Sequence, residues 1–91
     1  MVDTVPYQDH INSATTFERR FPFNVAESEL VWHRDYKNRE MTVVAGTGWQ
    51  FQLDNQMPVY INPGDQFVVA QGVYHRILRG FDDLVLQIRE F

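Results

Sequence analysis

The sequence predicts an all-β protein, a small antiparallel jelly-roll barrel with little or no helix. Short runs rich in Val, Ile, Phe, Tyr, Trp and Thr follow one another from residue 17 onward, and turn residues separate them about every ten residues. No segment carries an apolar helical stripe, because glycine or proline interrupts almost every window long enough to hold one. Strands without crossover helices between them must be antiparallel, and closure into a barrel or jelly roll removes their exposed edges.

Eight expected strands can be located by the turns between them. They comprise residues 17–23, 29–35, 41–45, 49–53, 58–61, 67–70, 74–78 and 84–88. Each run contains β-branched or aromatic residues, from the three Phe of residues 17–23 to the Leu-Val-Leu sequence that begins residues 84–88. The intervening turns hold most of the Gly and Asn residues, including the Asn-Pro-Gly-Asp sequence at 62–65.

The chain is expected to form one domain. It has 91 residues, no cysteine and 44% apolar side chains, so its core must form without a disulfide. Residues 1–16 are polar and are interpreted as an N-terminal arm or edge segment. Residues 17–91 are interpreted as a single barrel domain.

Composition argues against several classes of partner. The formal net charge is −4 and Lys37 is the single lysine, whereas a nucleic-acid-binding face is basic. No window approaches the roughly 20 apolar residues that a membrane span needs. The first residues include Asp3 and Asp9 and lack the pattern of a secretory signal, so we expect a cytoplasmic protein. Seven of the eight cationic residues are arginine, which suits the capture of a carboxylate or phosphate.

His33 and Asp35 form the first candidate site. The period of two along a strand places both on one face with Val31, at a spacing that lets both reach one metal ion. Two histidines and one carboxylate form a facial arrangement that suits iron(II) and similar ions. His75 is the credible third donor, because His10 lies in the polar arm. The alternative is a hydrogen-bonded His-Asp pair that binds no metal.

Two stretches resemble the motifs of the cupin superfamily. Residues 63–75 look like its second motif, since Gly64, Gly72 and His75 match the pattern while Ala70 and Arg79 replace its proline and asparagine. Residues 33–46 look like its first motif, with Asp35 where the second histidine of the pattern belongs.

The resemblance implies a jelly-roll barrel, usually dimeric, with a metal ion near its centre. By this resemblance His33, Asp35 and His75 are the expected ligands of a divalent ion, Fe, Mn, Ni or Zn. The glutamate of the motif falls on Arg39 or Glu40, depending on how the spacing is counted, and only one of these neighbours points inward. Arg39 is favoured because both of its spacings fit. It would then lie beside Asp35 as a neighbour of the three-ligand site. Alternatively, it would neutralise Asp35 and remove the need for a metal.

Three residues are candidate binders of a substrate. Arg79 shares a face with His75, so Arg39 and Arg79 together would suit a carboxylate or phosphate. The alternative is that Arg79, at the strand end beside Gly80, reaches solvent. Gln52 could line the same cavity as a neutral hydrogen-bonding group, or lie on the wet face of its strand. The charged stretch Glu18–Arg20 is interpreted as a solvated face.

The sequence therefore predicts a small cupin, expected to be a homodimer, that binds a divalent metal and a small anionic molecule. Oxygenation and metal-assisted isomerisation or elimination both remain open, because a fold does not fix its chemistry. The alternative is a metal-free ligand-binding or dimerisation module with a buried Asp35–Arg39 pair. A metal-free sugar-nucleotide epimerase is the least favoured interpretation, because the chain is far shorter than those enzymes.

Overall fold

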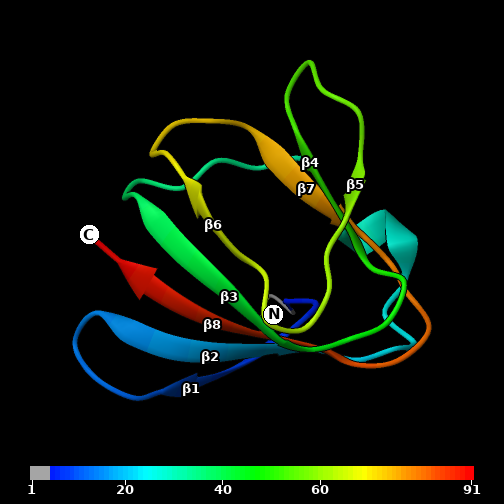
Figure 1. Ribbon diagram of the computed structural model, residues 1–91, viewed down its shortest axis with the longest axis horizontal. Coiled ribbons are helices and arrows are strands. Elements are labelled where there is room, and N and C mark those ends of the chain that lie inside the picture. The colour runs from blue at the N-terminus through cyan, green and yellow to red at the C-terminus, as the bar shows by residue number, and fades with distance from the viewer. Residues whose placement is uncertain (1–4) are drawn as a thin grey trace, which may run out of the picture.

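The computed structural model describes residues 5–91, whose regular structure is almost entirely β-strand (Figure 1). The strands are β1 (Gln8–Ile11), β2 (Thr16–Phe21), β3 (Arg39–Ala45), β4 (Gln50–Leu53), β5 (Val59–Tyr60), β6 (Gln66–Val69), β7 (His75–Leu78) and β8 (Leu84–Glu90). A 3-10 helix, η1 (Glu27–Glu29), is the one helical segment within residues 5–91. The described part of the chain therefore contains no helix that could cross a membrane.

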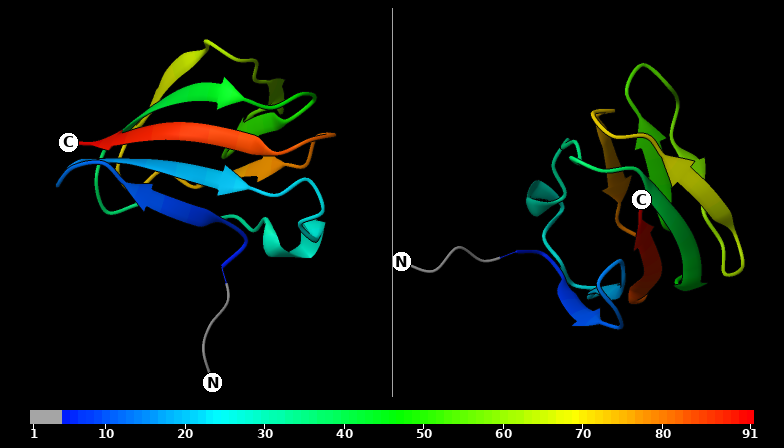
Figure 2. Two further views of the ribbon diagram at one scale, coloured as in Figure 1. Left: turned by 90° about the horizontal axis from the view of Figure 1, so that it is seen from below. Right: turned by 90° about the vertical axis from the view of Figure 1, so that its left-hand side faces the viewer.

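The strands form two antiparallel sheets that face one another (Figures 1 and 2). The larger sheet has the order β1-β2-β8-β3-β6, and the smaller has the order β5-β4-β7. The sheets share no strand, so the molecule is a two-sheet jelly roll rather than a continuously hydrogen-bonded barrel. The predicted all-β antiparallel class, with little helix, is confirmed.

The core lies between the two sheets and follows the period of two along the strands. On β8, Leu84, Leu86 and Ile88 all point inward and are buried. Trp49 is fully buried, and its indole Nε1 donates a 2.8 Å hydrogen bond to the Asp82 carbonyl. Burying each of these large apolar side chains contributes about 1.5–3 kcal/mol. The core thus holds the two sheets together around the space that the candidate site adjoins.

Residues 29–35 do not form the predicted strand. The backbone amides of Glu29 and Leu30 donate to the carbonyls of Ala26 and Glu27, as in a 3-10 turn. Those amides are then not available to a sheet ladder, and pairing with β7 is confined to one bridge, His33 with His75. The apolar content of this run suggested a strand, but local turn hydrogen bonds take its first donors.

The polar N-terminal stretch contributes β1, the outer strand of the larger sheet. Its four residues are exposed and pair with β2, with Asp9 opposite Arg19. The first four residues of the arm lie outside the described residues. The domain boundary at residue 17 stays a prediction, although β1 belongs to the same sheet as the strands that follow.

Candidate metal centre and cavity

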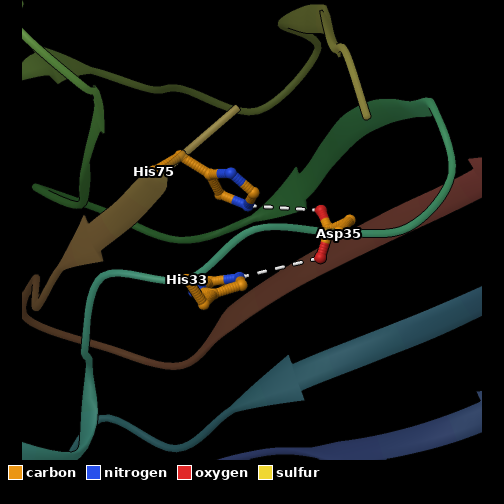
Figure 3. Close-up of side chains that lie close together, drawn as sticks. All are labelled: His33, Asp35 and His75. Carbon is orange, nitrogen blue, oxygen red and sulfur yellow. Dashed lines mark ion pairs between the residues drawn. The ribbon is translucent and has the colours of Figure 1, made fainter. Parts of the chain in front are cut away.

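His33, Asp35 and His75 come together at one end of the space between the sheets (Figure 3). His75 begins β7, and reciprocal backbone hydrogen bonds of 3.0 and 2.9 Å pair it with His33. This bridge sets the two imidazoles edge to face, with ring centroids 4.3 Å apart. One donor atom from each of the three residues lies within 4.8 Å of the others, as a shared metal ion requires.

The backbone of Asp35 is held by the turn before β7. The amide of Gly72 donates a 2.9 Å hydrogen bond to the Asp35 carbonyl. Gly72 adopts a φ of 79°, in the left-handed region that glycine enters without steric cost. A glycine of the second cupin-like motif therefore supports Asp35, which lies far earlier in the chain.

Both imidazoles are oriented by carbonyl groups of their own segments. Nδ1 of His33 lies 3.1 Å from the Val31 carbonyl, and Nδ1 of His75 lies 2.8 Å from the Val73 carbonyl. Because a carbonyl only accepts, each Nδ1 must carry the hydrogen, and in a neutral ring Nε2 then presents a lone pair. Backbone carbonyls commonly orient metal-binding histidines in this way.

Two polar atoms of the cluster are buried and have no hydrogen-bond partner within residues 5–91. Nε2 of His75 lies 3.3 Å from Oδ2 of Asp35, and neither atom makes a hydrogen bond with any other part of residues 5–91. Leaving a buried polar group unpaired costs about 1–3 kcal/mol. A cation held by both atoms would remove this cost, so the residues present fit a divalent metal.

The charge states of the cluster agree with such a role. Burial lowers the pKa of the His33 imidazole below its usual value, despite the opposing hydrogen bond to Val31. For Asp35, burial raises the pKa of the carboxyl, but the contact with His75 and the charge of Arg39 outweigh burial and bring it below its usual value. At neutral pH the cluster therefore offers a neutral His33 imidazole and an ionised carboxylate.

A cavity of about 340 Å³ adjoins the cluster. Its wall is mainly apolar and includes Leu30, Met41, Phe51, Ile77, Leu86 and Ile88. His33, Asp35 and His75 lie on the same wall, together with Arg19 and Arg39. A concave, mostly apolar site with a few convergent polar groups is the usual form of a small-molecule site.

The structure confirms that Arg39, and not Glu40, points inward. The Arg39 side chain is 14% exposed and its Nη1 lies 3.1 Å from Oδ1 of Asp35. Its Nε and Nη2 both lie 3.1 Å from Oε2 of Glu90, the cross-strand neighbour on β8. Glu40 lies on the outer face and pairs with Arg89. The position of the motif glutamate is thus occupied by a cation whose three nitrogens all face carboxylates.

Arg79 and Gln52 do not reach this cavity. Strand β7 ends at Leu78, so the alternation that places His75 and Ile77 inward does not extend to Arg79. Its Nη1 instead donates to the Val25 carbonyl at 3.0 Å. Gln52 lies on the outer face, where Arg76 Nε donates to its side-chain oxygen at 2.8 Å. Arg79 therefore follows the strand-end alternative rather than the inward placement, and Gln52 follows the wet-face alternative.

Arg19 is the cavity residue that the sequence interpretation placed on a solvated face. It lies between Phe17 and Phe21 on the inward face of β2, and its side chain is 11% exposed. The alternation Phe17, Arg19, Phe21 was the available signal. The charged neighbours Glu18 and Arg20 made the whole stretch look solvated, although only these two side chains point outward.

Solved structures identify the fold. A cupin-2 domain protein from Shewanella frigidimarina aligns with a TM-score of 0.65 at 18% sequence identity, over 96% of this chain and 81% of that chain. The chain has the cupin fold. A cupin domain from Bordetella pertussis aligns with a TM-score of 0.63 at 14% identity, over 99% of both chains. The iron(II) form of HppE aligns with a TM-score of 0.65 at 14% identity, over 84% of this cupin-fold chain and 41% of that chain.

No family model matches the sequence, and no curated protein matches it either. The cupin fold predicted from the two motif-like stretches is therefore confirmed by structure alone. The chemistry of the site has to be argued from this chain's own residues.

Proposed function

We propose that this cupin-fold protein binds a divalent metal ion through His33, Asp35 and His75 and binds or transforms a small anionic organic molecule in the adjoining cavity. One observation carries the proposal. Nε2 of His75 and Oδ2 of Asp35 are buried, face one another and have no hydrogen-bond partner within residues 5–91. Nε2 of His33 points at the same carboxylate, 4.0 Å from Oδ1 (Figure 3).

The donor set suits Fe, Mn, Ni or Zn, since two imidazoles and one carboxylate match the preferences of these ions. Such an ion, with positions left open, supplies Lewis-acid activation of a bound oxygen or a centre for dioxygen chemistry. HppE, a structural neighbour solved in its iron(II) form, supports iron among these candidates. His33 and His75 would hold the ion through Nε2, while Arg39 contacts the Asp35 carboxylate and the Gly72 amide holds the Asp35 backbone.

The charges around the cavity support an anionic ligand. Arg39 is balanced by Glu90, and Arg19 is balanced by Asp9. Asp35 alone would then oppose the double charge of the ion. The bound centre keeps about one positive charge in a largely apolar cavity, where charge is weakly screened. A small monoanion neutralises it.

The second candidate is a metal-free ligand-binding or dimerisation module. The contact of 3.1 Å between Asp35 and Arg39 favours it, because both side chains are largely buried and already form an ion pair. In that state His75 would carry a proton on both ring nitrogens and donate from Nε2 to Asp35. The homodimer and the cytoplasmic location stay predictions under either candidate.

Elemental analysis of protein purified without an affinity tag or chelator tests the first candidate. We expect close to one equivalent of Fe, Mn, Ni or Zn in the wild type and its loss in His75→Ala. His10→Ala is the matched control, since His10 is exposed on β1. Asp35→Asn, which keeps the shape of the side chain, guards against misfolding of the alanine variant. A wild type that takes up none of the four ions on incubation would contradict metal binding.

A further inference from the structure

We propose that Arg19 recognises the anionic group of the ligand and that the ligand is a monocarboxylate with an apolar body. This inference rests on the proposed function, since it names the ligand class of the same cavity. It replaces the expectation that Arg39 and Arg79 share that task.

Each nitrogen of the Arg39 guanidinium already faces a carboxylate. Nη1 faces Asp35, while Nε and Nη2 face Glu90, each at 3.1 Å. A carboxylate that used the remaining N–H groups of Arg39 would lie beside Asp35 and Glu90, whose negative charges would repel it in this weakly screened cavity. Arg39 is therefore a positioning residue for Asp35.

Arg19 differs from Arg39 in how its nitrogens are used. Its Nε and Nη2 form a bidentate pair with Asp9, at 2.8 and 2.9 Å. Within residues 5–91, Nη1 makes no hydrogen bond, although the side chain lines the cavity. A guanidinium presents donors in a fixed fork, so the third nitrogen keeps a defined direction once the other two are held.

Aromatic rings fix the plane of the Arg19 guanidinium. Its central carbon lies 3.6 Å from the Tyr7 ring centroid and 5.2 Å from that of Phe17. Stacking of this kind limits the rotamers of the side chain before any ligand arrives, which lowers the entropic cost of binding. The free donor is therefore preorganised.

The ligand class follows from what surrounds Arg19. Asp9 already neutralises one positive charge, so the remaining donor suits a singly charged group rather than a phosphate dianion. The cavity wall that Arg19 shares with the His-Asp cluster is built largely from aliphatic and aromatic side chains, including Met41, Ile88 and Leu86. A carboxylate at one end of an apolar chain or ring satisfies both features.

The charge balance gives two variants with opposite expected effects. Arg19→Gln removes the donor and should weaken carboxylate binding about tenfold, the loss typical of one charge-assisted hydrogen bond. Asp9→Asn keeps Arg19 but removes its competing carboxylate, so carboxylate binding should become about threefold or more tighter. A merely structural role of the pair would weaken binding in both variants.

Calorimetric titration with hexanoate and hexan-1-ol as probes tests the inference on protein whose metal content is measured in parallel. We expect hexanoate to bind the wild type more tightly than hexan-1-ol, and hexan-1-ol to bind the wild type and Arg19→Gln equally. Arg20→Gln is the matched control, because Arg20 neighbours Arg19 but points outward and pairs with Asp83. Hexanoate affinity should be unchanged in this control.

Equal hexanoate affinity in Arg19→Gln and Arg20→Gln would overturn the inference, and so would the absence of tighter binding in Asp9→Asn. The second variant decides the matter if Arg19→Gln fails to fold. Failure of the proposed metal site would be seen separately, as wild-type protein that contains no metal. The hexanoate affinities of the Arg19→Gln and Asp9→Asn variants can still be compared in the metal-free protein.

Discussion

Nε2 of His75 lies 3.3 Å from Oδ2 of Asp35, and both atoms are buried without a hydrogen bond to any residue from 5 to 91. Since Nδ1 of His75 must donate to the Val73 carbonyl, a neutral imidazole would place a lone pair against a carboxylate. Only a cation or a second proton on His75 relieves that repulsion. The choice between these two defines the function of the site.

Asp35→Asn should strongly weaken metal binding while leaving the fold intact. An amide oxygen is a weaker ligand than a carboxylate and removes the negative charge opposite Arg39, so affinity should fall about a hundredfold or more. Isothermal titration with Zn²⁺ measures this. Asp54→Asn, at an exposed position, provides the control. Equal Zn²⁺ affinity in both variants would remove Asp35 from the site.

Arg39→Gln should destabilise the protein much more than Arg89→Gln. Arg39 joins two acids in a largely buried network, and breaking a buried pair costs about 3 kcal/mol. Arg89 pairs with Glu40 in the open on the same sheet, and such a pair contributes less than about 1 kcal/mol. Urea unfolding measures both variants. Similar losses of stability would show that the Asp35–Arg39 contact has no special role.

Comparing Gly72→Ala with Gly64→Ala separates the effect of backbone strain on stability from the positioning of Asp35 by the Gly72 turn. Both glycines have positive φ, and a Cβ at either would meet no atom within 4 Å, so each variant should lose about 1 kcal/mol from backbone strain alone. Only the Gly72 amide holds the Asp35 carbonyl. An alanine keeps this amide, but relief of the strain at position 72 would move it away from Asp35, so metal affinity should fall in Gly72→Ala and not in Gly64→Ala. A similar affinity in both would mean that the turn does not position Asp35.

The metal-free protein should lose stability as the pH falls below the ordinary histidine range. The pKa of His33 is lowered in the folded state from 6.5, so the unfolded chain binds more protons between the folded pKa and 6.5. The free energy of unfolding then rises with pH across that window. Asp35 adds a second loss at lower pH, as the pH falls below 3.8 through its lowered folded pKa.

Urea unfolding in a chelator at pH 7.5 and 5.5 measures the histidine contribution. His33→Gln should show a smaller loss of stability at pH 5.5 than the wild type, and His10→Gln should behave as the wild type does. An unchanged pH dependence in His33→Gln would contradict the lowered pKa of His33.

Much of the site could be predicted because its determinants are local. The spacing of His33 and Asp35 and the motif-like turn before His75 gave the three clustered residues, and the motif spacing gave Arg39 as the inward neighbour. A single antiparallel bridge between His33 and His75 was enough to bring the two stretches together.

What the sequence did not reveal depends on partners far along the chain. The alternation Phe17, Arg19, Phe21 indicated an inward Arg19, but Asp9, the partner on the neighbouring strand that balances its charge, became evident only in the structure. The sequence left two placements open for Arg79, and the structure shows the strand-end one because β7 ends one residue earlier, where the alternation stops. The apolar run at 29–35 failed as a strand because 3-10 hydrogen bonds competed with the sheet ladder.

Nitrogen NMR of the histidine rings during titration with Zn²⁺ tests the metal site most directly. We expect the Nε2 resonances of His33 and His75 to shift together and to saturate at one equivalent, while His10 stays unchanged. Rings that do not respond to Zn²⁺, with His75 protonated on both nitrogens at neutral pH, would contradict the metal site and establish the metal-free pair.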